Sequence, residues 1–562
     1  MFLQALLLLL AAVLFVEPAH VFQSHRLVQF DKNGQSFGSR KTAVNHIATL
    51  AKYTGSSTET PQKSEAVSDV DDDHEVDESK EPTEKLSKKN NKDLARLMVI
   101  TKIEDLSPEH LADIVDRRGA AGVLILIPKD LTLVSQQQLE QWKILERYMV
   151  SRSFEVPVYF SVEDESTKET YESLQSHSTS QESVVDWFQV VVNGPEATLL
   201  PAVPVHNFQG WHHSAPSVTA DTESLPTIAI VANYDTFGAA PGLSFGSDHN
   251  GSGAVALLEL VRIFSRLYSE FRTHGSYNIL FVLTGGGRMN FAGAKHWLKT
   301  VDPRLLESLE FALCLEAVGL AAEKLYLHVS KKPKTPEIRN LYNNFVDTAQ
   351  FMDIPFEVMQ WKINISSPFI NWQHEQFSRK RILAGTLSGR ATPAPVFSAA
   401  SIFDTKEFAK PEVLERNIKF IAEAVSKQIY GFAGKELEVV KDSLGVSKKF
   451  VRSWMQYLGS QPRQAQYTSQ NTELMNNIEV VLNKYCADSK KSTFTLDAGF
   501  KFYKATSTDM YIYKVKPWTF ELMLLTAILA YLLVFHLAVK QPKSWSELVE
   551  ALSFKKKDSR KR

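Results

Sequence analysis

Apolar and polar residues alternate in blocks along the middle of the chain, and this pattern predicts an α/β domain. Short apolar runs of strand length are found at 227–232, 277–283, 311–315, 325–329 and 382–387. Between them lie segments with helical spacing of apolar residues, beginning at Gly253 and covering 291–298 and 411–430. Strands that alternate with helices are typical of a mixed, mostly parallel sheet covered by helices on both faces.

The flanking regions predict further parts. Residues 20–209 contain β-type runs at 97–102, 122–127 and 156–162 and a helical segment at 108–116, which indicates a smaller N-terminal α/β region. Within it, residues 56–93 are polar with a strongly acidic centre, which favours a disordered loop over an acidic docking site. The main domain is predicted over 225–435, and a helical membrane-proximal region over 436–516.

Two apolar segments near the ends of the chain bear on targeting. The first, at 5–16, is shorter than the roughly 20 residues that a spanning helix needs. It fits the apolar core of a signal peptide over 1–19, with a buried N-terminal helix as the alternative. The second, at 518–539, contains only Glu521, His536 and Tyr531 as titratable residues and predicts a transmembrane helix, followed by a basic cytosolic tail over 540–562.

These segments together predict a single-pass type I membrane protein whose bulk is translocated. Two glycosylation triplets agree with that topology, Asn250-Gly-Ser252 and Asn364-Ile-Ser366. Across the 562 residues, 63 basic and 64 acidic side chains leave a net charge of -1, so no basic field points toward nucleic acid. Only Cys314 and Cys486 are present, which excludes a disulfide framework.

One stretch carries a recognisable motif. Ile228-Ala-Ile-Val-Ala-Asn-Tyr-Asp-Thr-Phe-Gly is followed by Pro241-Gly, by Ser247-Asp-His-Asn-Gly-Ser-Gly and by Glu259-Leu-Val-Arg. This order resembles the M28 family of co-catalytic zinc aminopeptidases over about 225–429. The resemblance implies a site in which two zinc ions share a bridging carboxylate and a Glu acts as general base.

The metal-ligand positions of that family are largely replaced here. The first His ligand falls at Asn233, the bridging Asp at His249, and the Glu-Glu pair of base and ligand at Gly287-Arg288. The next carboxylate ligand falls at Glu316 and the last His near Ala400, ahead of Asp404-Thr405. A catalytic zinc needs about three protein ligands, so the resemblance predicts a pseudoenzyme with no catalytic residues, no bound metal and no cofactor.

Other chemistries remain as alternatives. A single metal held by His249, Glu316 and either Asp235 or Asp248 would leave residual aminopeptidase activity. Gly242-Leu-Ser244-Phe-Gly246 matches a nucleophile pattern, but that pattern requires a strand immediately before the Ser, and a long loop precedes Ser244. Residues 285–287 lack the Lys-Ser/Thr of a phosphate loop and predict a tight turn.

Within the M28-like group the chain is similar to the nicalin family, which is related to nicastrin. The similarity rests on the predicted topology and on three segments, Trp372-Gln-His-Glu-Gln-Phe, Ile382-Leu-Ala-Gly-Thr-Leu-Ser and Gln461-Pro-Arg-Gln-Ala-Gln. It implies a scaffold in the endoplasmic reticulum membrane that assists multipass membrane-protein biogenesis. The implied partners are the nodal modulator protein, a multispanning membrane protein, the Sec translocon and client membrane proteins. A receptor for client N-termini, as in nicastrin, is the further alternative.

Overall fold

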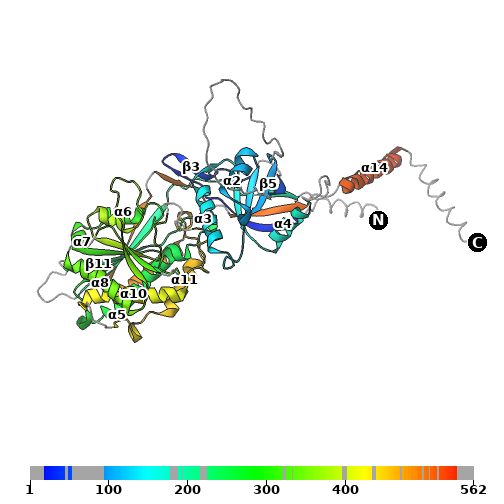
Figure 1. Ribbon diagram of the computed structural model, residues 1–562. Coiled ribbons are helices and arrows are strands. Elements are labelled where there is room, and N and C mark those ends of the chain that lie inside the picture. Colours follow the sequence, from blue (N-terminus) through cyan, green and yellow to red (C-terminus); the bar gives the residue numbers. More distant parts are fainter. Residues whose placement is uncertain are drawn as a thin grey trace, which may run out of the picture.

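A computed structural model describes residues 18–44, 48–53, 94–177, 188–192, 194–214, 225–320, 324–331, 333, 335–394, 401–432, 438–468, 471–496, 499–504, 507–514 and 518–540. These residues form two globular units and a separate C-terminal helix (Figure 1). The predicted acidic loop, Ala400, nearly all of the predicted signal peptide and nearly all of the predicted basic tail lie outside the described residues.

The first unit is a closed β-barrel built from both ends of the chain. Around the barrel the strands follow the order β1 (His20–Arg26), β19 (Ser507–Lys514), β9 (Phe188–Val192), β4 (Ala48–Lys52), β5 (Leu97–Lys102), β6 (Gly122–Ile127) and β8 (Val158–Val162). Strands β4, β5, β6 and β8 are parallel, whereas β1 and β19 pair antiparallel with His20 opposite Ile512. The strands at 97–102 and 122–127 have the bounds that their apolar runs predict.

Three helices pack around the barrel, α2 (Pro108–Ala112), α3 (Gln136–Val150) and α4 (Glu165–His177). Helix α3 begins at a capping box, because the Ser135 hydroxyl accepts from the Gln138 N–H while the Gln138 side chain accepts from the Ser135 N–H. A smaller sheet lies beside the barrel and consists of β18 (Phe500–Phe502), β2 (Phe30–Lys32), β3 (Gln35–Ser39) and β7 (Ser153–Phe154).

The second unit contains an eight-stranded sheet. Its order is β15 (Phe356–Gln360), β14 (Leu325–Val329), β16 (Ala384–Ser388), β13 (Leu309–Leu315), β11 (Thr227–Asn233), β12 (Asn278–Thr284), β10 (Pro204–His212) and β17 (Asp488–Thr495). Four of the strand pairings are parallel and three are antiparallel, so the predicted mixed, mostly parallel sheet is confirmed.

Helices cover both faces of this sheet. They are α5 (Gly253–Leu267), α6 (Ala292–Thr300), α7 (Pro303–Ser308), α8 (Pro336–Phe351), α9 (His374–Arg379), α10 (Pro411–Tyr430), α11 (Lys448–Gly459), α12 (Ala465–Thr468) and α13 (Thr472–Tyr485). Strand β11 shows the two-sided burial, because Ile228 and Ile230 face the core of α5, α8 and α10, while Ala229 and Val231 face that of α6 and α9. Helix α5 is buried on nearly its whole surface.

Two predicted boundaries are wrong. The helical region predicted over 436–516 is helical only as far as Tyr485, after which come strands β17, β18 and β19. Strand β17 reads Asp-Ser-Lys-Lys-Ser-Thr-Phe-Thr, with no apolar run, and it forms because it pairs with β10 along its length. Strand β10 itself, assigned by sequence to the N-terminal region, belongs to the sheet of the second unit.

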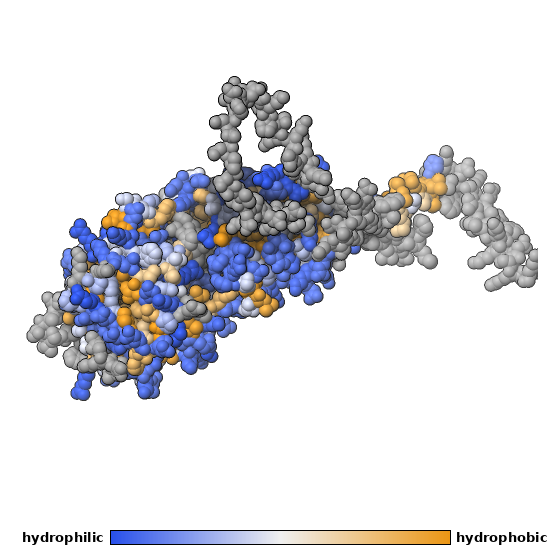
Figure 2. Space-filling view, viewed as in Figure 1, coloured by the Kyte–Doolittle hydropathy of each residue, from blue (hydrophilic) through white to orange (hydrophobic). Residues whose placement is uncertain are grey.

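The C-terminal helix α14 (Trp518–Lys540) lies apart from both units (Figure 1). Its apolar side chains are exposed, including Leu522, Leu533 and Phe535, and they form a continuous hydrophobic surface in Figure 2. In the part of the chain that the structure describes, no helix has both the length and the apolar character required to cross a membrane.

Candidate functional site

The positions singled out by the motif lie at one edge of the central sheet. Strand β11 ends at Asn233, β12 is followed by the turn 285–288, and β13 is followed directly by Glu316. Because these three strands are parallel, their carboxyl ends meet, and loops there bring side chains from distant parts of the chain together. The turn Ser247–Ser252, in which Asn250 has a positive φ of 81°, precedes α5 and adds Asp248, His249 and Asn250.

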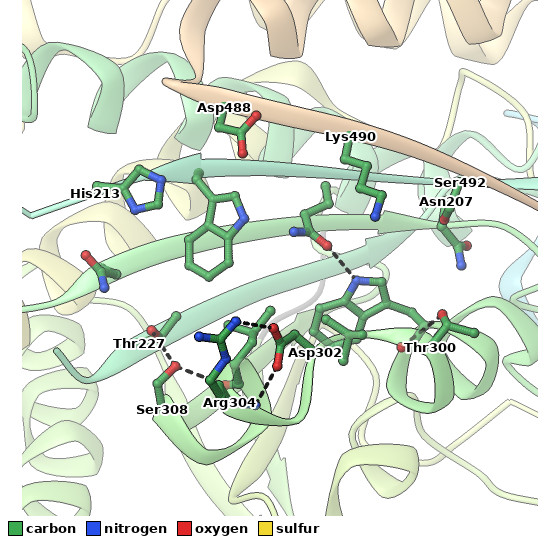
Figure 3. Close-up of a pocket in the computed structure, with 16 residues that line it drawn as sticks. Asn207, His213, Thr227, Thr300, Asp302, Arg304, Ser308, Asp488, Lys490 and Ser492 are labelled. Carbon is green, nitrogen blue, oxygen red and sulfur yellow. Dashed lines mark hydrogen bonds and ion pairs between the residues drawn. The ribbon is translucent and has the colours of Figure 1, made fainter. Parts of the chain in front are cut away.

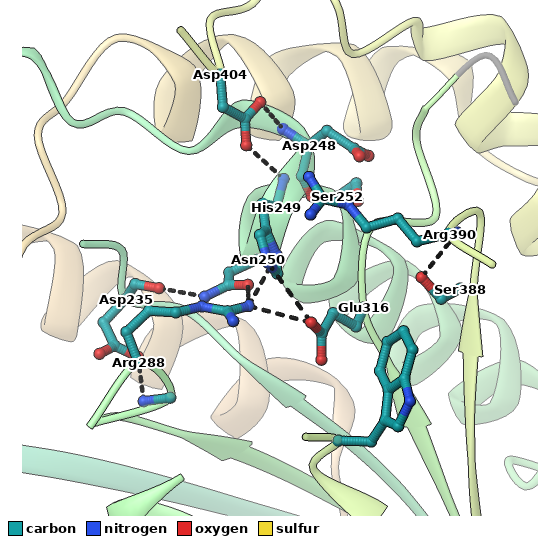
Figure 4. A network of polar contacts seen from close by, with 12 residues as sticks. Asp235, Asp248, His249, Asn250, Ser252, Arg288, Glu316, Ser388, Arg390 and Asp404 are labelled. Carbon is teal, nitrogen blue, oxygen red and sulfur yellow. Dashed lines mark hydrogen bonds and ion pairs between the residues drawn. The ribbon is translucent and has the colours of Figure 1, made fainter. Parts of the chain in front are cut away.

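Arg288 is the centre of this cluster (Figure 4). Its guanidinium lies 2.8 Å from His249 Nδ1, donates to Asn250 Oδ1 at 2.8 Å, and donates to Glu316 Oε1 at 3.2 Å. All four residues are at most 3% exposed. Burial lowers the pKa of Arg288, but the neighbouring Glu316 carboxylate opposes that shift. Position 288 therefore holds a buried cation that is paired with the Glu316 carboxylate.

His249 is held as a neutral imidazole. Burial, and then the Arg288 charge, lower its pKa well below the ordinary value. Because a guanidinium can only donate, His249 Nδ1 must be the acceptor, which places the ring proton on Nε2. That nitrogen faces Glu316 Oε1 at 3.5 Å. The imidazole thus bonds to Arg288 through Nδ1 and lies beside Glu316, and it is fully buried from solvent.

Asn233 and Gly287 are packed against each other. Asn233 is fully buried, and a Cβ atom added at Gly287 would lie 2.0 Å from its Nδ2 atom. Position 287 therefore accepts only glycine while Asn233 keeps this side-chain position. The Gly287 N–H donates to Asp235 Oδ1 at 2.8 Å, and burial raises the pKa of that aspartate. The turn 285–288 is thus tied to the loop after β11.

Asp248 faces a different environment. Its N–H and that of His249 donate to the Asp404 carboxylate at 2.9 and 2.7 Å, and Asp248 Oδ1 accepts from the Gly319 N–H at 2.9 Å. Burial and the nearby Asp404 charge raise the pKa of Asp248 to about 7. Asp248 and Asp404 line a pocket of about 510 Å³, together with Arg390 and with Lys143 from α3.

Sequence reasoning missed two residues that organise the site. Asp404 was noted only as a marker of the last ligand position, yet its carboxylate holds the backbone of Asp248 and His249. Arg463 is fully buried and donates to the carbonyls of Tyr234, Phe245 and Gly246, which fastens the loop between β11 and α5. Arg463 lies in the segment 461–466 that carries part of the family resemblance, but it is 230 positions beyond Asn233, and its spacing does not predict a contact with this loop.

The remaining candidate residues are Ser244, considered as a nucleophile, and the two glycosylation candidates Asn250 and Asn364. The Ser244 hydroxyl is buried and donates to the Ala240 carbonyl at 2.7 Å, so it is no exposed nucleophile. Asn250 is buried, and its side-chain amide contacts Arg288 and the Asp235 carbonyl, so the folded chain does not present it for glycosylation. Asn364 is exposed on the loop between β15 and α9.

These residues do not fit the two zinc ions of an M28 peptidase. Within the described ranges, no group of three or more His, Cys, Asp or Glu side chains is arranged to hold a metal ion. A cation at Glu316 would compete with the Arg288 guanidinium, which already lies 3.2 Å from its Oε1 atom. Among the residues that the structure describes, zinc-activated water chemistry therefore lacks a set of ligands.

Comparison with known proteins found a matching family model, similar proteins and a solved structure with the same fold. The family model described as peptidase family M28 matches residues 217–380. The chain is 33% identical to BOS complex subunit NCLN of Mus musculus, over 99% of this chain and 95% of that protein. It is 25% identical to nicalin of Caenorhabditis elegans, over 74% of this chain and 79% of that protein. The crystal structure of the gamma-secretase component nicastrin shares the fold, with a TM-score of 0.56 and 11% identity over 89% of this chain and all of that one.

Proposed function

Because the chain belongs to the nicalin family, we propose that it is a non-catalytic scaffold subunit of a complex in the endoplasmic reticulum membrane. The M28-like unit provides a lumenal binding surface, and the complex assists the biogenesis of multipass membrane proteins. The fold alone does not determine this activity, so the proposal rests on the site.

The proposal that the protein is not catalytic rests on one observation, the position of Arg288. Arg288 lies where the M28 pattern has a metal ligand, and its guanidinium is bound to His249, Asn250 and Glu316. The preceding position, where the pattern has the general base, is Gly287, and Asn233 fills the space that a side chain there would need. A site without base or metal cannot activate water, whereas the buried ion pair and its hydrogen bonds keep the surrounding loops rigid.

The partners follow from relatives. Mammalian relatives are named as subunits of the BOS complex, and similarity over nearly the whole chain supports membership of an equivalent complex. The proposed partners are the nodal modulator protein, a multispanning membrane protein, the Sec translocon and client membrane proteins. In this proposal the exposed apolar side chains of α14 pack against lipid and partner helices.

The test is to purify the tagged full-length protein from membranes in mild detergent. Mass spectrometry identifies the co-purifying proteins, and metal content is measured on the same sample. We expect stoichiometric membrane partners, no stoichiometric zinc, and the same assembly after treatment with a chelator. A protein that purifies alone with one bound zinc, which is lost in Glu316→Ala, would refute the scaffold and establish the single-metal aminopeptidase.

A receptor for client N-termini is a second candidate, and the pocket beside Asp248 favours it. Asp248 Oδ2 has no hydrogen-bond partner among the described residues, and it is a buried acceptor suited to an amine. Glu316 Oε2 also has no hydrogen-bond partner among these residues, but Glu316 does not line the pocket, whereas Asp248 does. Asp248→Asn should then abolish cross-linking to clients with a free α-amine and leave acetylated clients unaffected. Equal cross-linking in both proteins would exclude this role.

A further inference from the structure

A second pocket lies on the α6 face of the eight-stranded sheet, and Arg288 does not line it (Figure 3). It has a volume of about 520 Å³, within the range of roughly 300–1,000 Å³ that is common for small-molecule sites. Helix α6 covers β11 and β12 on this face and also contacts the last two strands, because Trp297 bonds to Gln209 of β10 and His296 stacks on Phe494 of β17. The pocket opens beside these contacts.

The register of these two strands builds the floor. Trp211 lies opposite Asp488, Gln209 opposite Lys490, and Asn207 opposite Ser492. Because residues two apart in a strand point to the same face, all six side chains line one surface. Trp211 is half-buried, and its ring stacks on that of His213 at a centroid distance of 5.3 Å. The floor of the pocket therefore presents the Trp211 ring beside a row of polar side chains.

The opposite wall comes from α6 and α7. The Trp297 indole N–H donates to Gln209 Oε1 at 3.0 Å, which fixes the Gln209 amide at the pocket. Asp302 and Arg304 form an ion pair of 3.0 Å, and Figure 3 shows them across the pocket from Asp488 and Lys490. The two acidic and two basic side chains balance, so the pocket does not select for a charged ligand.

A neutral ligand that suits this lining has one apolar face and many hydroxyl groups. Sugars have that character, because their ring C–H groups lie against an indole while their hydroxyls both donate and accept hydrogen bonds. We propose that this pocket is a carbohydrate-binding site that takes a neutral oligosaccharide, with a sugar ring against Trp211 and hydroxyls at Gln209, Asp302 and Asp488. This site is independent of the scaffold role, since it uses none of the residues around Arg288.

Binding is tested with the full-length protein in lipid nanodiscs, which avoids detergents with sugar headgroups, after enzymatic removal of its own glycans. The probes are mannobiose, maltose and chitobiose, titrated by saturation-transfer NMR. We expect saturable binding of at least one probe, and about a tenfold or greater loss of affinity in Trp211→Ala. Trp361→Ala is the matched control, because Trp361 is exposed outside the pocket.

A second variant separates binding from folding. Asp488 is exposed on the edge strand, so Asp488→Ala should leave the thermal unfolding midpoint unchanged while it weakens sugar binding. The proposal fails if none of the three disaccharides binds saturably, or if both variants bind as tightly as the natural chain. If an extended peptide gives NMR signals that depend on Trp211, and none of the sugars does, the open edge of β17 would instead be identified as a peptide-binding groove.

Discussion

Glu146 and Ile402 are 256 positions apart in the chain, yet the Glu146 carboxylate accepts from the Ile402 N–H at 3.1 Å. The same Oε1 atom accepts from the Ala239 N–H at 2.8 Å. Glu146 projects from α3 beside the barrel, and both donors belong to loops at the M28-like site. One buried carboxylate thus joins the two globular units at the place where the site loops begin.

Glu146→Ala should destabilise the protein by about 3 kcal/mol, because two buried backbone N–H groups lose their acceptor. The measurement is the free energy of unfolding by denaturant, followed by tryptophan fluorescence. Glu140→Ala is the control on the same helix, since Glu140 is exposed and bonds to the side chains of Gln136 and Lys143 on the helix surface, and it should change little. Equal effects of the two variants would contradict a joining role for Glu146.

Arg288→Leu should cost about 3–5 kcal/mol, because the buried Glu316 carboxylate then lacks its cation. The double variant Arg288→Leu with Glu316→Gln should recover part of that loss, since no buried charge remains unpaired. Thermal unfolding reports both effects. Arg40→Ala, which breaks the exposed Arg40–Glu155 pair, should leave the unfolding midpoint unchanged.

Gly287→Ala should destabilise the protein by about 1–3 kcal/mol, because its Cβ would overlap the Asn233 amide. Adding Asn233→Ala should restore part of the stability by emptying that space. A non-additive double-mutant cycle, measured by denaturant unfolding, is the expected result. Strict additivity would show that the two side chains do not compete for the same volume.

The pKa of Asp248, raised to about 7, predicts a pH dependence of stability. Between about pH 4 and pH 7 the folded chain retains a proton that the unfolded chain has released, so stability should fall as pH rises through that window, by up to about 1.4 kcal/mol per pH unit. Asp248→Asn should remove this slope. His249, whose pKa is lowered, acts in the opposite sense, and its contribution is present in both proteins. An identical pH profile in the two proteins would exclude the shift.

Asn364→Gln should abolish the endoglycosidase-sensitive shift of the protein on a gel, because Asn364 is the exposed triplet and Asn250 is buried. A remaining shift in this variant would mean that Asn250 is modified before the chain folds.

Local pattern explains the parts of the fold that sequence could predict. Apolar runs such as 97–102 and 122–127 predict buried strands, because a strand that is buried on both faces has apolar residues at successive positions. Strand β17 could not be found this way, since its hydrogen bonds to β10 determine its conformation and its side chains are polar. Strand β19 is a different case, since Met510 and Ile512 are buried in the barrel and alternate with more exposed residues, a period-two pattern that the sequence analysis did not use.

The residues of the candidate site also fall into those that local pattern predicts and those that it does not. The motif brings Asn233, His249, Arg288 and Glu316 to one place because each lies at a fixed offset from a strand or helix end. Asp404 and Arg463 act through backbone groups of other loops, and such contacts depend on the tertiary structure and leave no signature in spacing.

The pairing of β1 with β19 determines when the barrel can be completed. His25 and Ser507 share a hydrogen bond of 2.8 Å across 482 positions, so the first strand must wait for a partner that is synthesised almost last. Closing so long a loop is entropically costly and slow, and until then the edges of β1 and β9 that pair with β19 stay open. The first residues of the mature chain should therefore need protection from aggregation throughout synthesis, and truncation before Ser507 should leave the N-terminal unit misfolded even though most of its residues are present.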